Sequence, residues 1–125
     1  MSNESSLARV ARTPEPPYYS VTTTAELTDA FDRAEHVRLG TELFAQARES
    51  GGFLGLEAFY DGSASIAVSY WTDLDAIDRW RRHLAHGAAK ARAKDGWFGP
   101  TITRIARVEA AYGFNLPERR RTAPG

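Results

Sequence analysis

The chain has 125 residues, of which 42% are hydrophobic and 11% aromatic, enough to fill the core of one domain. Its 16 basic and 16 acidic side chains cancel, which argues against a nucleic-acid or membrane-surface partner. The sequence has no cysteine, so disulfides, thiolate catalysis and iron–sulfur clusters are excluded. No apolar stretch has the length of a signal or membrane-spanning segment, and we therefore expect a cytoplasmic protein.

Both ends of the chain have the composition of disordered tails. Residues 1–17 are polar and contain three prolines, and residues 117–125 are basic because of a run of three arginines. We therefore assign the folded domain to residues 18–116. The arginine run is too short to indicate a nucleic-acid partner.

The first part of the domain predicts a strand followed by a helix. Aromatic, valine and threonine residues from Tyr18 to Leu27 favour a strand. Asp32, with Glu35 three positions later, has the spacing of a capping box at the start of a helix. Apolar residues then recur at helical spacing until Ser50, where two glycines end the helix.

A hairpin and a second helix follow. The strand-forming runs 53–60 and 64–71 flank an Asp-Gly pair, which indicates a tight turn between antiparallel strands. Thr72 is predicted to cap the next helix. The apolar stripe of that helix includes Trp80, and Gly87 is expected to kink or split it.

The last predicted strand covers residues 102–111, after an aromatic loop that Pro100 ends. The resulting order is β-α-β-β-α-β, the split βαβ arrangement of a ferredoxin-like α+β fold with two helices on one face of a four-stranded antiparallel sheet. The opposite sheet face has no cover within the chain, although its strands carry apolar residues on both faces. We therefore expect a homodimer that closes an α+β barrel.

The second half of the domain carries a family resemblance. The residues on which it rests are Tyr70-Trp71, Ile77, Trp80, His86, Arg104-Ile105, Val108-Glu109 and Tyr112-Gly113-Phe114. Over residues 18–115 the chain resembles the antibiotic biosynthesis monooxygenases, dimeric α+β barrels, in the branch that also contains heme-degrading monooxygenases. The resemblance implies a substrate cavity between the sheet and the helices of each protomer.

The resemblance implies one of two oxidative activities. Some members oxidise polycyclic phenols with oxygen and no bound metal or flavin, and others bind heme and open its ring. The heme-degrading members use an Asn on the first strand, a Trp on the second helix and a His ten positions after it. Trp80 matches the Trp, but Lys90 stands at the His position and the first strand has no Asn. Heme is therefore the alternative cofactor, with His83 or His86 as the iron ligand.

The leading hypothesis is a monooxygenase that oxidises a small aromatic or polyketide-like molecule with O2, without a tightly bound flavin or metal. The predicted catalytic residues are Trp80, His83 and His36, because an imidazole can assist deprotonation while an indole orients the ring. The predicted substrate-binding residues are Thr22, Thr24, Tyr70, Trp71, Trp97, Phe98 and Arg104.

The candidate residues also have structural interpretations. Trp80 lies on an apolar stripe and fits a core position, and His36 fits a buried, hydrogen-bonded histidine. His83 and His86 have the i, i+3 spacing of two metal ligands, but no third ligand stands at a recognisable spacing, so no metal site is assigned. A non-catalytic module that binds a small molecule is the third hypothesis. No motif for nucleotides, phosphate transfer or serine hydrolysis is present.

Overall fold

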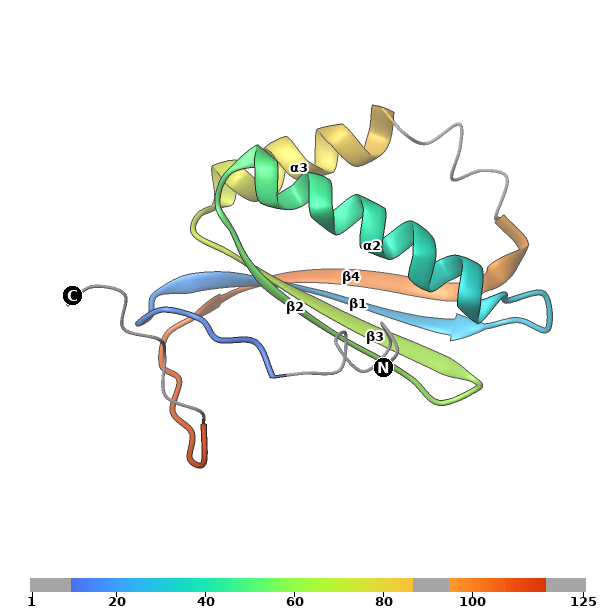
Figure 1. Cartoon of the computed structure of the whole chain (residues 1–125), viewed down its shortest axis with the longest axis horizontal. Helices are drawn as coiled ribbons and strands as arrows, with labels where there is room; N and C mark the ends of the chain where they lie inside the picture. The colour runs from blue at the N-terminus through green and yellow to red at the C-terminus, as the bar shows by residue number, and fades with distance from the viewer. Residues whose placement is uncertain (1–9, 87–94, 117–125) are drawn as a thin grey trace.

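The computed structural model describes residues 10–86 and 95–116, and Figure 1 shows two helices packed on one face of a single sheet. The elements in chain order are β1 (Tyr18–Leu27), α2 (Arg33–Ser50), β2 (Phe53–Tyr60), β3 (Ala64–Trp71), α3 (Leu74–His86), the short 3-10 helix η1 (Asp95–Trp97) and β4 (Phe98–Val108). The sheet order is β2-β3-β1-β4, and all neighbours are antiparallel. The predicted ferredoxin-like α+β fold is confirmed. Residues 1–9 and 117–125 of the predicted tails, and the expected kink at Gly87, lie outside the described residues.

Side-chain caps begin both helices. Asp32 accepts a hydrogen bond from the backbone N of Glu35 at 3.0 Å, as predicted. The second cap corrects the prediction, because Asp73 and not Thr72 accepts from the backbone N of Ala76, at 2.8 Å. Asp73 directly precedes the first helical residue, where a carboxylate reaches the unpaired N–H groups of the first turn. Thr72 instead donates its hydroxyl to Asp73 Oδ2.

The last strand begins at Phe98 rather than at residue 102, and it ends at Val108. Its early start is fixed by pairing with β1, since Leu27 lies opposite Phe98. Pro100, predicted to precede the strand, lies inside it. An edge strand tolerates proline, and β4 pairs with β1 alone, so the missing N–H of Pro100 interrupts no second ladder.

The core lies between α3 and the C-terminal end of β3. Trp71 is completely buried and Trp80 is 6% exposed, and their ring centroids are 6.0 Å apart. The indole N–H of Trp71 donates to Ser69 Oγ at 2.9 Å, so the buried donor is paired. A Cβ on Gly52 would come within 2.4 Å of Ala76, and the positive φ of Gly52 also favours glycine there. The other buried members of this cluster are Ala47, Ala76 and Ile77.

The sheet face opposite the helices is covered only in part. Residues 10–17, which the sequence predicted as part of a disordered tail, lie on this side of the sheet (Figure 1). The backbone N of Ala11 donates to Glu57 Oε2 at 2.9 Å, and Thr13 donates to the Tyr18 hydroxyl at 2.8 Å. The alternation along the strands places three exposed apolar side chains on the rest of this face: Phe59 (54% exposed), Ile66 (43%) and Ile102 (47%).

Candidate functional site

A pocket of about 540 Å³ lies between α2 and the sheet, at the end where β2 turns into β3. Its lining comes from three segments. They are α2 (His36, Leu39, Gly40, Leu43, Phe44), the β2–β3 hairpin (Leu56, Ala58, Phe59, Tyr60, Ser65, Ile66, Ala67) and the start of β4 with the residue before it (Trp97, Phe98, Gly99, Thr101). None of these lining residues is Asp, Glu, Lys or Arg. The pocket therefore suits a largely apolar ligand that carries a few polar groups.

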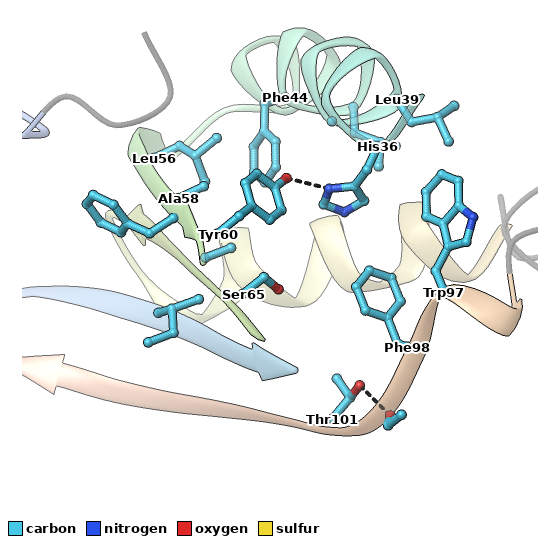
Figure 2. Close-up of a pocket in the computed structure, with 16 residues that line it drawn as sticks. His36, Leu39, Phe44, Leu56, Ala58, Tyr60, Ser65, Trp97, Phe98 and Thr101 are labelled. Atoms are coloured by element: carbon cyan, nitrogen blue, oxygen red, sulfur yellow. Dashed lines mark hydrogen bonds between the residues drawn. The ribbon is translucent and has the colours of Figure 1, made fainter. Parts of the chain in front are cut away.

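His36 and Tyr60 supply a polar pair at one end of this pocket (Figure 2). Nδ1 of His36 and the Tyr60 hydroxyl are hydrogen-bonded to one another. Figure 2 shows the second ring nitrogen of His36 turned away from Tyr60, toward the part of the pocket that lies between Ser65 and Phe98. In the tautomer that carries its proton on Nδ1, His36 donates to the Tyr60 oxygen and Nε2 is a free acceptor.

Aromatic rings enclose the imidazole of His36. Its ring centroid lies 5.3 Å from that of Phe31, 5.7 Å from Trp97 and 5.5 Å from Phe98. Phe31 immediately precedes the N-cap of α2 and His36 is the fourth residue of the helix, which is the spacing of a hydrophobic staple. The backbone N of Thr28 donates to the carbonyl of Trp97 at 2.9 Å, and this bond ties the loop after β1 to the start of β4.

Burial lowers the pKa of His36 below its ordinary value. The cause is desolvation, because the imidazolium form loses water among the surrounding rings. His36 is therefore neutral at pH 7. A neutral imidazole with one free nitrogen accepts a proton from a ligand bound beside it, which is the role of a general base.

A second pocket, of about 580 Å³, continues the space between sheet and helices toward α3. The two pockets share Phe44, Leu56 and Ala67 in their walls. The remaining lining residues of the second pocket are Val21, Thr23, Ser69, Ile77, Trp80, Arg81, Leu84, Thr103 and Ile105. The helix-facing side of the sheet therefore carries a trough with two compartments.

Five of the predicted site residues lie in this layer between sheet and helices. His36, Trp97 and Phe98 line the first pocket. Trp80 contributes to the wall of the second pocket while packing in the core. Trp71 also points toward the helices but is completely buried, so it supports the trough from within the core.

Four other predicted residues lie on the opposite face of the sheet. Thr23 and Thr103 line the trough, so the alternation of side chains places Thr22, Thr24 and Arg104 on the other side. Tyr70 is there too, where its hydroxyl donates to Glu57 at 2.7 Å. The placement of these four side chains between sheet and helices is therefore corrected. The sequence shows which side chains of a strand share a face, but it does not show which face the helices cover.

Tyr70 is a poor base as well as remote from the trough. Burial, followed by the hydrogen bond to the Glu57 carboxylate, raises the pKa of Tyr70 above its ordinary value. The phenol therefore stays protonated and holds Glu57, which in turn holds the N-terminal segment at Ala11. This group of contacts positions residues 10–17 on the sheet.

His83, predicted to be a catalytic residue on the second helix, is exposed. Its Nε2 is hydrogen-bonded to Gln46 Oε1 at 2.6 Å, and its ring stacks on Trp80 with centroids 5.1 Å apart. It therefore covers the outer side of Trp80 and lines neither pocket. The side chain of His86 lies outside the described part of the structure. Within the described residues, no three His, Asp or Glu side chains come together as a metal site would require.

Two residues of the first pocket region were not anticipated from the sequence. Tyr60 ends β2 directly before the Asp-Gly turn, and nothing in the local pattern marks it as a partner of His36. Phe31 did carry a usable signal, since an apolar residue before an N-cap packs on the fourth helical residue. Applied to Asp32 as the N-cap, this rule predicts the contact between Phe31 and His36 that the structure shows.

The sequence has a clear relative. It is 33% identical over 101 residues to the uncharacterized protein YqjZ of Bacillus subtilis (strain 168), a match that covers 80% of this chain and 87% of YqjZ. No protein-family profile matches the sequence. In the part of the chain that the structure describes, no helix has the length and apolar character needed to cross a membrane.

Solved structures share the fold at low identity. SnoaB from Streptomyces nogalater, a cofactor-independent oxygenase, superposes with a TM-score of 0.57 at 14% identity over 81% of this chain and 100% of its own. A candidate antibiotic biosynthesis monooxygenase from Bacillus cereus gives 0.53 at 13% identity over 78% and 99%. A dimeric ferredoxin-like protein from an uncultured marine organism gives 0.57 at 7% identity over 78% and 92%. The chain thus belongs to the same family as YqjZ, and its fold is of the antibiotic biosynthesis monooxygenase type.

Proposed function

We propose that this protein is a monooxygenase that uses O2 to oxidise a small phenolic or polyketide-like aromatic molecule, without a tightly bound flavin or metal. One observation carries the proposal: a neutral, half-buried His36, bonded through one ring nitrogen to Tyr60, faces an uncharged aromatic pocket. The fold shared with SnoaB, a cofactor-independent oxygenase, supports it. The cysteine-free sequence supports a cytoplasmic location as part of the same proposal.

The roles in this proposal follow the geometry of the pocket. In this role His36 accepts a proton from the substrate at Nε2, while Nδ1 donates to the Tyr60 hydroxyl and holds the ring in place. Trp97 and Phe98 stack on the flat substrate beside His36. Deprotonation leaves an electron-rich ring, which then reduces O2. The pocket has few polar groups and excludes water from this step.

A defined reaction shows how the atoms balance. Dithranol, a dihydroxyanthrone, loses one proton from its ring methylene carbon to His36, and the carbanion passes one electron to O2. The carbon radical and superoxide then form a carbon–oxygen bond, and the peroxide takes back the proton from His36. Loss of water leaves the quinone chrysazin, so one dithranol and one O2 give one chrysazin and one water.

The first experiment measures oxygen uptake and chrysazin formation with dithranol, with and without the protein. The proposal predicts uptake above the uncatalysed rate, one quinone per O2, and loss of the protein-dependent rate in His36→Gln. Tyr60→Phe should retain part of the rate, because the base remains but its tautomer is no longer fixed. A wild-type rate equal to the uncatalysed rate, in spite of measurable dithranol binding, would favour the non-catalytic binding module.

Heme is tested in the same series by titration with hemin. A saturable Soret shift at one heme per chain, followed by its decay with ascorbate under air, would replace the cofactor-free proposal with heme degradation. Among the described histidines, His36 has a ring nitrogen free toward the pocket and would be the ligand to test, whereas Nε2 of His83 is bonded to Gln46.

We also propose that the protein is a homodimer. The three exposed apolar side chains on the sheet face opposite the helices and the dimeric ferredoxin-like neighbour support this assembly. Light scattering after size-exclusion chromatography should give twice the chain mass. Ile102→Glu should lower that mass to a monomer, whereas Leu74→Glu, exposed at the start of α3, should not.

A further inference from the structure

The two pockets lie in line along β3. Ser65 and Ala67 line the first pocket, and Ala67 and Ser69 line the second. Every second side chain of a strand points to the same face, so these three lie on one side of β3. The strand rises about 13 Å from Ser65 to Ser69. The two pockets are therefore adjacent, and Phe44 belongs to the walls of both.

The two compartments differ in charge. The first is lined by no Asp, Glu, Lys or Arg, whereas the second is lined by one such residue, Arg81 on α3. Its neighbour on the helix, Arg82, is paired with Asp78 and lines neither pocket. Among the described residues Arg81 has no ion-pair partner. A guanidinium at the mouth of an otherwise neutral trough is a receptor for a carboxylate.

Building on the proposed function, we infer that the substrate is an elongated aromatic acid that occupies both compartments. Its phenolic end lies beside His36 and its carboxylate reaches Arg81. The hydroxyl groups of Thr23, Ser69 and Thr103 line the wall between these ends and suit the carbonyl or hydroxyl groups of a polyketide-like ring system. Arg81 is then a specificity-determining residue, which fixes the direction in which the ligand enters.

A matched pair of probes tests this assignment by calorimetric titration. Rhein is a dihydroxyanthraquinone with one carboxylate, and chrysazin is the same ring system without it. We expect rhein to bind roughly tenfold more tightly than chrysazin, since one charge-assisted hydrogen bond at a solvent-exposed mouth is worth about that much. In Arg81→Gln the two affinities should agree within about twofold, with chrysazin affinity unchanged.

Arg82→Gln is the control, because it removes the same charge from the adjacent position. This variant should keep the full preference for rhein. Equal binding of rhein and chrysazin by the wild-type protein, binding of neither probe, or equal loss of rhein affinity in both variants would overturn the inference. The titrations measure binding without turnover, so they can contradict the anion site at Arg81 independently of the proposed oxygenase activity. A rhein preference that depends on Arg81, together with no protein-dependent oxygen uptake, would remove the oxygenase and leave the anion site.

Discussion

His36 and His83 lie on the two helices that cover the sheet, His36 in the first turn of α2 and His83 in the last turn of α3, and their surroundings differ. Each imidazole contacts aromatic rings and is hydrogen-bonded to one side chain from another element, Tyr60 for His36 and Gln46 for His83. The His36 side chain points from α2 into a group of three rings, Phe31, Trp97 and Phe98, and lines a pocket. His83 instead stacks on the outer side of Trp80. The sequence predicted a catalytic role for both.

The comparison shows that access to a pocket depends on what fills the space beside a residue. At the α3 end, Trp71 and Trp80 fill the layer between helix and sheet, so His83 is displaced outward. At the α2 end, Gly40 on α2 and Ala58 on β2 are small and leave a cavity next to His36. The α3 end therefore combines the buried core with the second compartment, whereas at the α2 end the space beside His36 is open.

The largest contrast between the two histidines should appear in turnover. His36→Ala removes the proposed base and should lower kcat with dithranol roughly a hundred- to ten-thousandfold. His83→Ala should change kcat less than about twofold, because its ring contacts Trp80 and Gln46 only from outside. Equal losses in the two variants would remove the distinction, and retained activity in His36→Ala would assign the base elsewhere.

The two ends of the layer should also differ in stability. Trp71→Ala empties a completely buried site and should lower the free energy of unfolding by about 3–5 kcal/mol. Urea denaturation measures this loss, with His83→Ala as the exposed comparison at within about 0.5 kcal/mol. A small loss for Trp71→Ala would mean that the α3 end is not the densely packed core.

The dependence of stability and activity on pH tests the surroundings of His36. The folded pKa of His36 lies below its unfolded value of about 6.5, so the imidazole stays neutral through neutral pH and loses activity only on the acid side. The stability that this group contributes is present above about 6.5 and is lost as the pH falls toward the lower folded pKa. In His36→Gln this part of the acid loss should disappear from denaturation curves, while His83→Gln should retain it.

The smallest effects should come from the caps of α2 and α3, the two helices that carry His36 and His83. Asp32→Ala and Asp73→Ala each remove a side-chain acceptor at the start of a helix and should each lower stability by about 1 kcal/mol. Asp32→Ala should also lower turnover, since the first turns of α2 place His36. Asp73→Ala should leave turnover unchanged. Thermal melts give the stability, and a loss of turnover in both variants would show that α3 also positions the reacting groups.

Local patterns predicted the fold well. The strand-forming runs, the Asp-Gly turn and the cap at Asp32 each depend on neighbouring residues, and all three are confirmed. The errors arose where two local choices competed. Thr72 and Asp73 are both good caps, and the start of β4 was set by pairing with Leu27 on β1, a distant partner that periodicity does not show.

The site was less predictable because it depends on the covered face of the sheet. Alternation separated Thr22 and Thr24 from Thr23 but did not say which side the helices cover. The contact between His36 and Tyr60 joins residues 24 positions apart in the sequence, and no spacing rule links a helix start to a strand end. Phe31 was the exception, since its position before the N-cap predicts its contact with His36.

The most direct test of the site at His36 is a proton–nitrogen NMR spectrum of the histidine rings, recorded across pH with and without chrysazin. The account predicts that His36 titrates below about 6.5 and that its ring signals shift when chrysazin is added, while the signals of His83 do not move. A ligand-induced shift at His83 with none at His36 would contradict it and would place the binding site at the other end of the layer.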